Sequence, residues 1–217
     1  MPRPGKKTRT RTFREHGVTL TLVDCGTHHE LKIGDVPILT SALLGTEHAF
    51  GRLAPRTATR IVVGGLGFGS TLAGVLETVG QDAQVIVVEK LETVVRLVRG
   101  ELSHLARGAL DDPRVTLVKD DVCAVIARER DVDAVLLDVD NGPEWGSFRT
   151  NARLYDARGL LAAKAALGPG GVYAVWSGYP ADEFRDRLRK AGLRPSVVLF
   201  RERGRVQARA YVGKKPA

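Results

Sequence analysis

A glycine-rich turn that follows a short apolar run is the strongest signal for ligand binding in this sequence. Residues 60–70 read RIVVGGLGFGS, which predicts a β-branched strand entering a turn that contains Gly64, Gly65, Gly67 and Gly69. Glycine lets the backbone bend sharply and approach a ligand closely, and the helix that follows points its free N–H groups at that ligand. The dinucleotide-binding pattern GxGxxG does not fit, because Ser70 stands where its last glycine would be. We expect this turn to hold a ligand; a role in packing alone is the alternative.

An acidic residue ends the next predicted strand. Glu89 closes the run QVIVVE, 20 residues after Gly69. A carboxylate at this place can accept hydrogen bonds from both hydroxyls of a ribose held over the glycine turn. A solvent-facing strand end beside Lys90 is the other interpretation, but position and spacing together favour the ribose role.

Two further acids follow the third predicted strand, in LVKDDV. Asp120 and Asp121 fall at the carboxyl edge of the sheet, where open α/β folds bind ligands. A carboxylate here can accept a hydrogen bond from an adenine amino group. Capping of the next helix is the alternative, and one of the two residues could cap while the other binds.

The fourth predicted strand ends in AVLLDVDNGPEWGSF and supplies the candidate catalytic residues. Asp138 and Asp140 lie at the same edge of the sheet, before a loop that contains Trp145 and Phe148. Two carboxylates beside such a loop could orient an amine and take its proton during attack on a sulfonium carbon. Turn formation would also explain Asp140 and its neighbours, whereas Asp138 directly terminates an apolar central strand.

Strands and helices alternate from Arg60 onward, as a parallel sheet covered on both faces requires. The expected strands are 61–63, 84–89, 115–118, 134–138, 172–176, 196–200 and 207–212. The expected helices are 70–79, 91–106, 122–128, 153–167 and 181–191. This order predicts an α/β fold with a doubly wound, mostly parallel seven-stranded sheet, whose last two strands form a hairpin around Arg203-Gly204-Arg205.

Three segments are expected along the chain. Residues 1–16 are basic and predict a disordered tail. Residues 17–56 predict a small β-hairpin region, from the alternating runs 18–23 and 29–39, and a helix over 41–53 that leads into the main domain. Residues 57–217 form the ligand-binding domain.

Composition narrows the classes of protein that fit. Of the 217 residues, 43% are hydrophobic and 27% charged, which is typical of a soluble globular protein, and no apolar run approaches the length of a membrane span. We therefore expect a cytoplasmic protein without membrane contact. The two cysteines and five histidines lack metal-ligand spacing, so no metal site is expected. The net charge of +8 could bind nucleic acid through the basic tail, but without interleaved aromatic residues a solvated tail is favoured.

The chain contains the segments GGLGFG, VVEK, VKDDV, LLDVDNGP and RLYDARGLLAAKAALGPGGV. In their order and separation these segments resemble the spermidine synthase superfamily, over about residues 17 to 176. These are polyamine aminopropyltransferases built on the class I methyltransferase-like Rossmann fold, in which the GxGxG form of the turn occurs. The resemblance implies that S-adenosylmethionine or its decarboxylated form is bound, and that a homodimer forms. By this similarity the turn glycines line the methionine part, Glu89 holds the ribose, Asp121 holds the adenine amino group and Asp138 takes the proton. The candidate substrate-binding residues are Glu47, Asn141, Trp145 and Tyr155.

The sequence departs from both related classes at the end of the site where they differ. Aminopropyltransferases usually read GGGDGG, so Gly67 replaces the aspartate that faces the aminopropyl amine, and Asn141 stands where an amine-binding acid is usual. Many methyltransferases carry an acid where this chain has Val63. We expect transfer of an aminopropyl or methyl group to an amine. The alternatives are a methyltransferase that acts on a small molecule or nucleic acid, and a non-catalytic cofactor-binding protein whose tail binds nucleic acid.

Overall fold

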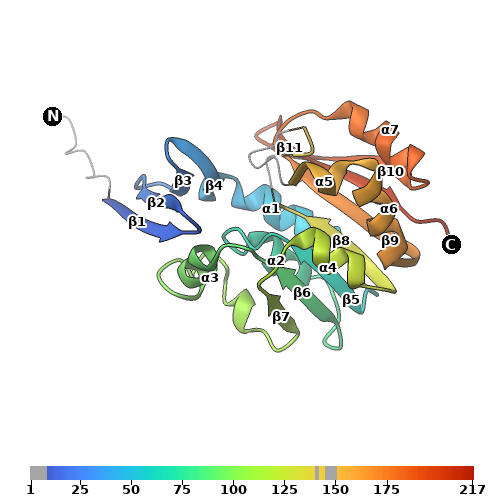
Figure 1. The fold of residues 1–217 in the computed structure, drawn as a ribbon, viewed down its shortest axis with the longest axis horizontal. Coiled ribbons are helices and arrows are strands. Elements are labelled where there is room, and N and C mark those ends of the chain that lie inside the picture. The colour runs from blue at the N-terminus through green and yellow to red at the C-terminus, as the bar shows by residue number, and fades with distance from the viewer. Residues whose placement is uncertain (1–8, 140–141, 145–150) are drawn as a thin grey trace.

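A computed structural model describes residues 9–139, 142–144 and 151–217 of the chain. Its main feature is a seven-stranded sheet with the order β10-β11-β9-β8-β5-β6-β7 (Figure 1). The strands are β5 Arg60–Gly64, β6 Gln84–Val88, β7 Val115–Val118, β8 Val132–Leu137, β9 Leu167–Ser177, β10 Arg194–Glu202 and β11 Arg205–Lys214. Neighbouring strands from β7 to β9 are parallel, and β11 runs antiparallel to both β9 and β10. The predicted doubly wound, mostly parallel sheet is confirmed, and its order reverses between β5 and β8, where such folds bind ligands.

Helices cover both faces of this sheet (Figure 1). They are α1 Leu44–Gly51, α2 Ser70–Leu76, α3 Glu92–Arg99, α4 Val122–Arg128, α5 Ala152–Tyr155, α6 Ala157–Ala166 and α7 Asp182–Lys190, with short 3-10 turns at Ser41–Leu43 and Ala109–Asp111. Ile61 and Val63 of β5 pack into one core with α1, α2 and α3, while Val62 packs into a second core with α4, α6 and α7. Alternate residues of a strand point to opposite faces, so a strand buried on both sides reads as a continuous apolar run.

One expected helix is divided. The sequence predicts a single helix over 153–167, but the structure ends α5 at Tyr155 and begins α6 at Ala157. Asp156 lies between them in an extended conformation, and its carboxylate accepts a hydrogen bond from the Gly159 N–H at 2.8 Å. This side chain caps α6 and so starts a new helix within the apolar repeat.

The N-terminal region forms a separate four-stranded antiparallel sheet with the order β1-β2-β3-β4. Its strands are β1 Arg9–Glu15, β2 Val18–Asp24, β3 His29–Ile33 and β4 Val36–Thr40. β1 differs from the disordered tail expected over 1–16, because every residue from Arg9 to Glu15 pairs with β2 and Phe13 packs against the core. Thr and Arg alternate in RTRTFRE, a pattern that suits an edge strand. The basic charge of this segment had instead favoured the prediction of a disordered tail.

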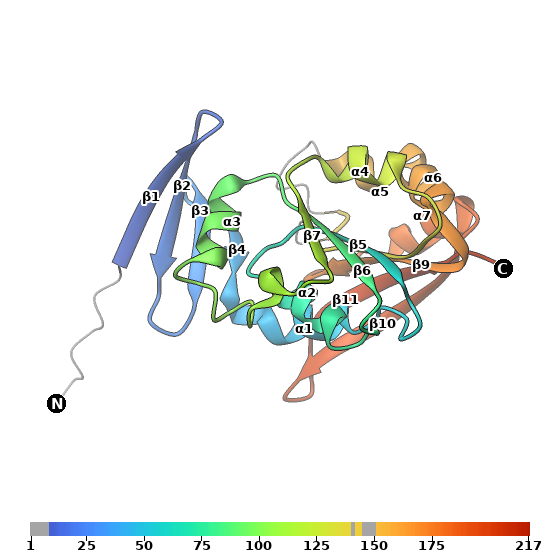
Figure 2. The same ribbon diagram turned by 90° about the horizontal axis from the view of Figure 1, so that it is seen from below.

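The small sheet lies at one end of the molecule, beside α3 (Figure 2).

Within the described part of the chain, no helix has both the length and the apolar character that a membrane span requires.

Candidate active site

A cavity of about 310 Å³ lies between the small sheet and the carboxyl ends of the parallel strands. The structure brings six of the predicted residues to its wall: Gly65, Gly67, Glu89, Asp120, Asp121 and Asp138. The small sheet supplies His16, Val18, Ile33, Ile38 and Leu39 to the opposite side. The small sheet therefore forms part of the cavity wall, although none of its residues was predicted to contact a ligand.

The glycine turn divides into packing positions and a position open to the cavity. Gly65, Gly67 and Gly69 all have positive φ, at +89°, +51° and +83°. A Cβ atom on Gly65 would lie 2.3 Å from the Asp138 carbonyl oxygen, and one on Gly69 would lie 2.5 Å from the Ala106 Cβ. At Gly67 the nearest atom would be 3.8 Å away, on Leu39. Gly65 thus allows the close approach of two strand ends, whereas Gly67 leaves space beside the ligand site.

Glu89 is held in a defined orientation at the end of β6. Its Oε2 accepts a hydrogen bond from the Leu66 N–H at 3.0 Å, and its Oε1 accepts one from the Leu91 N–H at 2.8 Å. Burial raises the pKa of Glu89, and these backbone donors oppose that shift. Each carboxylate oxygen can accept more than one hydrogen bond. Glu89 could therefore accept further hydrogen bonds while keeping those that hold its side chain, and the ribose contact stays a prediction.

Asp120 and Asp121 line the cavity and also have structural partners. Asp121 caps α4 by accepting a hydrogen bond from the Cys123 N–H at 2.9 Å, and its second oxygen pairs with Arg153. Asp120 accepts from the Asp121 N–H and from Arg128, each at 2.7 Å. The capping role that the sequence allowed is thus present at Asp121. Contact with adenine stays a prediction for both residues.

Two carboxylates, Asp138 and Glu47, meet at a second, smaller cavity. This space of about 40 Å³ shares Gly67 and Asp138 with the larger cavity and is also lined by Glu47 and Trp176. The Thr71 hydroxyl donates a hydrogen bond to Asp138 Oδ2 at 2.6 Å. Burial raises the pKa of Asp138 to about 6, and burial followed by the charge of Asp138 raises the pKa of Glu47 well above its usual value. A cation between the two would favour ionisation of both.

Close packing of α1 on α2 places Glu47 in the site. A Cβ atom on Gly51 would lie 2.1 Å from the Thr71 carbonyl oxygen, and one on Gly74 would lie 2.1 Å from the His48 carbonyl oxygen. The Ser70 hydroxyl also donates to the Leu44 carbonyl at 2.7 Å. These contacts join α1 to the first turn of the helix that follows the glycines.

Stability should reveal the raised pKa of Asp138. Its ordinary pKa is 3.8 and its folded pKa about 6, so the unfavourable contribution is absent well below pH 4, grows between pH 4 and pH 6 and is constant at higher pH. We expect Asp138→Asn to gain up to about 3 kcal/mol of unfolding free energy relative to wild type between pH 4 and pH 8. Urea unfolding at both pH values measures this difference, and a constant difference would show that Asp138 has an ordinary pKa.

The other predicted residues fall outside the two cavities or outside the described residues. Tyr155 is buried, with its ring edge-to-face against Phe184 at a centroid distance of 6.0 Å, and neither cavity includes it. Asp140, Asn141, Trp145 and Phe148 lie outside the described residues. Thr71 and Trp176 were not predicted. Only Thr71 carried a signal in the sequence, its place two residues after Gly69.

One group of possible metal ligands occurs in the described chain, at the turn between β2 and β3. The ligand atoms of Cys25, His28 and Glu30 lie within 4.8 Å of one another. Glu30 already pairs with Lys32 at 3.0 Å and with His28 at 3.3 Å. A metal ion would have to displace the lysine, so we assign no metal to this group.

Comparison with known proteins gives sequence matches over about half of this chain. No protein-family model matches the chain. It is 33% identical over 118 residues to a polyamine aminopropyltransferase of Aeropyrum pernix, across 54% of this chain and 36% of that protein. A match to polyamine aminopropyltransferase 2 of Pseudomonas aeruginosa has 33% identity over 120 residues, across 53% and 32%. The matched region thus spans about a third of the length of each relative.

Solved structures extend the comparison to nearly the whole chain. A spermidine synthase in complex with the transition-state analogue AdoDATO superposes with a TM-score of 0.73 and 17% identity, covering 95% of this chain and 72% of the other. An S-adenosylmethionine-dependent O-methyltransferase of Thermotoga maritima gives a TM-score of 0.54 and 22% identity, covering 80% and 65%. The resemblance stated from the motifs is confirmed: the chain has a spermidine synthase-like, S-adenosylmethionine-dependent methyltransferase fold.

Proposed function

We propose that this chain transfers an alkyl group, aminopropyl or methyl, from decarboxylated or ordinary S-adenosylmethionine to an amine. The observation that carries the proposal is the Asp138–Glu47 carboxylate pair, which lies beside the glycine turn where the two cavities meet. The sequence relationship to polyamine aminopropyltransferases supports the same reaction class.

The larger cavity suits a nucleoside. Its volume of about 310 Å³ is at the lower end of the range of small-ligand sites, and most of its wall is apolar. Glu89 would hold the ribose, Asp120 or Asp121 would meet the adenine, and Gly67 leaves room for the chain beyond the sulfur. The same wall fits both forms of the donor over their shared adenosine half.

The donor supplies an electrophilic carbon bonded to a positively charged sulfur. The protein must then orient a neutral amine toward that carbon and accept one proton. Asp138 is the acceptor that we assign, because Thr71 fixes its carboxylate and a pKa of about 6 leaves it ionised yet basic at neutral pH. Glu47 adds a second acidic group that attracts an ammonium ion to the smaller cavity.

The preference of the site for one of the two donors can be tested by substitution of Gly67. This residue has φ +51° and open space around it, a conformation that aspartate adopts more readily than most residues. We expect Gly67→Asp to shift the ratio of affinities at least tenfold toward decarboxylated S-adenosylmethionine, about 1.4 kcal/mol, because a carboxylate attracts its amine and repels the carboxylate of the ordinary form. Calorimetry with both donors measures the ratio. Gly67→Asn is the uncharged control, and an equal shift in that variant would exclude a charge effect.

Within this proposal, methyl transfer is the option that Gly67 favours, because it lacks the acid expected for an aminopropyl donor. It predicts tighter binding of ordinary S-adenosylmethionine by the wild-type chain. Binding of nucleic acid through the N-terminal basic residues would instead show as a steep dependence on salt that is lost when residues 1–8, which precede β1, are deleted. By similarity we also propose a homodimer, which light scattering tests.

A further inference from the structure

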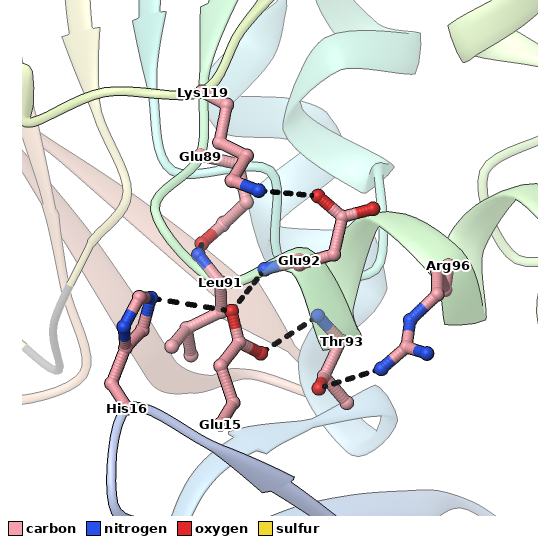
Figure 3. A network of polar contacts seen from close by, with 8 residues as sticks. All are labelled: Glu15, His16, Glu89, Leu91, Glu92, Thr93, Arg96 and Lys119. Atoms are coloured by element: carbon pink, nitrogen blue, oxygen red, sulfur yellow. Dashed lines mark hydrogen bonds and ion pairs between the residues drawn. The ribbon is translucent and has the colours of Figure 1, made fainter.

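We propose that the turn between β1 and β2 is part of the nucleoside-binding site and that Glu15 is the residue that positions it. This inference rests on the proposed function, since it concerns the same cavity. His16 and Val18 flank Gly17 at the end of the small sheet, and both line the cavity together with Glu89 and Leu91. Figure 3 shows Glu15 and His16 directly beside the start of α3.

The first turn of α3 lacks a capping side chain of its own. Leu91 occupies the N-cap position and offers no side-chain hydrogen bond. Glu15 supplies the missing acceptors from β1, taking hydrogen bonds from the Glu92 N–H at 2.6 Å and the Thr93 N–H at 2.9 Å (Figure 3). A helix leaves its first N–H groups free and attracts negative charge at that end. The carboxylate is therefore well matched to this position.

Glu15 and Glu89 together accept the hydrogen bonds of the free N–H groups at the start of α3. Glu89 accepts from the Leu91 N–H, and Glu15 accepts from the next two amides. The Glu15 side chain is only 9% exposed. Burial raises the pKa of Glu15, but the hydrogen bonds from Thr93 and Glu92 outweigh it and leave the pKa below its usual value. The acid is thus ionised and fixed next to the residue that we expect to hold the ribose.

The turn after Glu15 fixes His16 and Val18 at the cavity wall. His16 and Gly17 have φ +50° and +78°, as in a two-residue hairpin turn with both central residues left-handed. So short a turn gives His16 and Val18 little freedom once Glu15 is bound to α3. The His16 ring lies 3.7 Å from Glu15 Oε1 and is 68% exposed, which places it at the mouth of the cavity.

Calorimetry on the full chain tests the proposal, with methylthioadenosine as the probe because both donors contain it. Glu15→Ala should weaken binding at least tenfold, while turnover at saturating donor changes little. His16→Gly should weaken binding more than twofold; glycine accepts the positive φ, so the turn and the cap are kept. Glu101→Ala is the matched control. It removes an exposed 2.6 Å ion pair with Arg11 that also joins β1 to the chain after α3, and binding should stay within twofold of wild type.

The outcomes separate this inference from the proposed function. If wild-type protein does not bind methylthioadenosine, the proposed function fails and the inference fails with it. If wild type binds and His16→Gly binds within twofold of it, the turn is no part of the site and only the inference is overturned. The same holds if Glu15→Ala loses no more affinity than Glu101→Ala, or loses turnover at saturating donor as well. Should Glu15→Ala not fold, His16→Gly decides the question alone.

Discussion

Asp138→Asn is expected to lower turnover by about 100- to 10,000-fold, the usual contribution of a general base. Asparagine can still accept the hydrogen bond from Thr71, so the local structure should persist, but the amide cannot take a proton from the amine. Binding of methylthioadenosine should stay within about threefold of wild type, since the adenosine contacts that we assign to Glu89 and Asp121 are untouched. Steady-state kinetics and calorimetry on the same preparation measure both quantities.

Asp133→Asn is a control on the same strand. Asp133 lies at the other end of β8 and accepts hydrogen bonds from the Thr59 and Arg60 N–H groups at 2.7 and 3.0 Å. Its loss should cost stability and leave turnover per folded molecule unchanged. Full activity in Asp138→Asn would remove this residue from the mechanism, whereas equal losses in both variants would indicate a structural effect.

Gly65→Ala should destabilise the fold by about 3 kcal/mol or more, because positive φ and a steric collision act together. The added methyl would lie 2.3 Å from a backbone oxygen, that of Asp138, which cannot rotate away. Relief of this contact requires the ends of β5 and β8 to separate, so the Asp138 carboxylate would move and ligand binding would weaken. Urea unfolding and calorimetry at neutral pH measure the two effects.

Gly67→Ala provides the matched comparison within the same turn. Its φ is also positive, but the nearest atom to the new methyl is 3.8 Å away. Only the backbone penalty applies, about 1–2 kcal/mol. Equal destabilisation by the two alanines would show that the close approach of β5 to β8 does not require glycine at Gly65.

The candidate site combines groups from two sheets with different tasks. The parallel sheet carries Glu89 and Asp138 at strand ends, where side chains of successive strands meet. The small sheet and α1 close the site from the other side, with His16 at the mouth and Glu47 at the smaller cavity. In the proposed reaction, the Asp138–Glu47 pair would supply the acidic groups at the sulfur end of the site, where Gly67 supplies none.

The sequence by itself determined the order of the seven strands of the large sheet and the position of the glycine and acidic residues that line the larger cavity. Periodic burial and glycine placement are local properties, and parallel strands always gather their carboxyl ends at one edge. Glu89, Asp120, Asp121 and Asp138 could therefore be placed together at this edge of the sheet without a structure.

Only the tertiary structure decided which carboxylates lie near each other and which segments close the cavity. Glu47 and Asp138 are far apart in sequence and both line the smaller cavity because Gly51 and Gly74 let α1 approach α2 closely. Arg9 to Glu15 form a strand only through pairing with β2, and Glu15 reaches α3 only because that sheet lies beside it. Such contacts depend on how elements pack, which residue spacing along the chain does not encode.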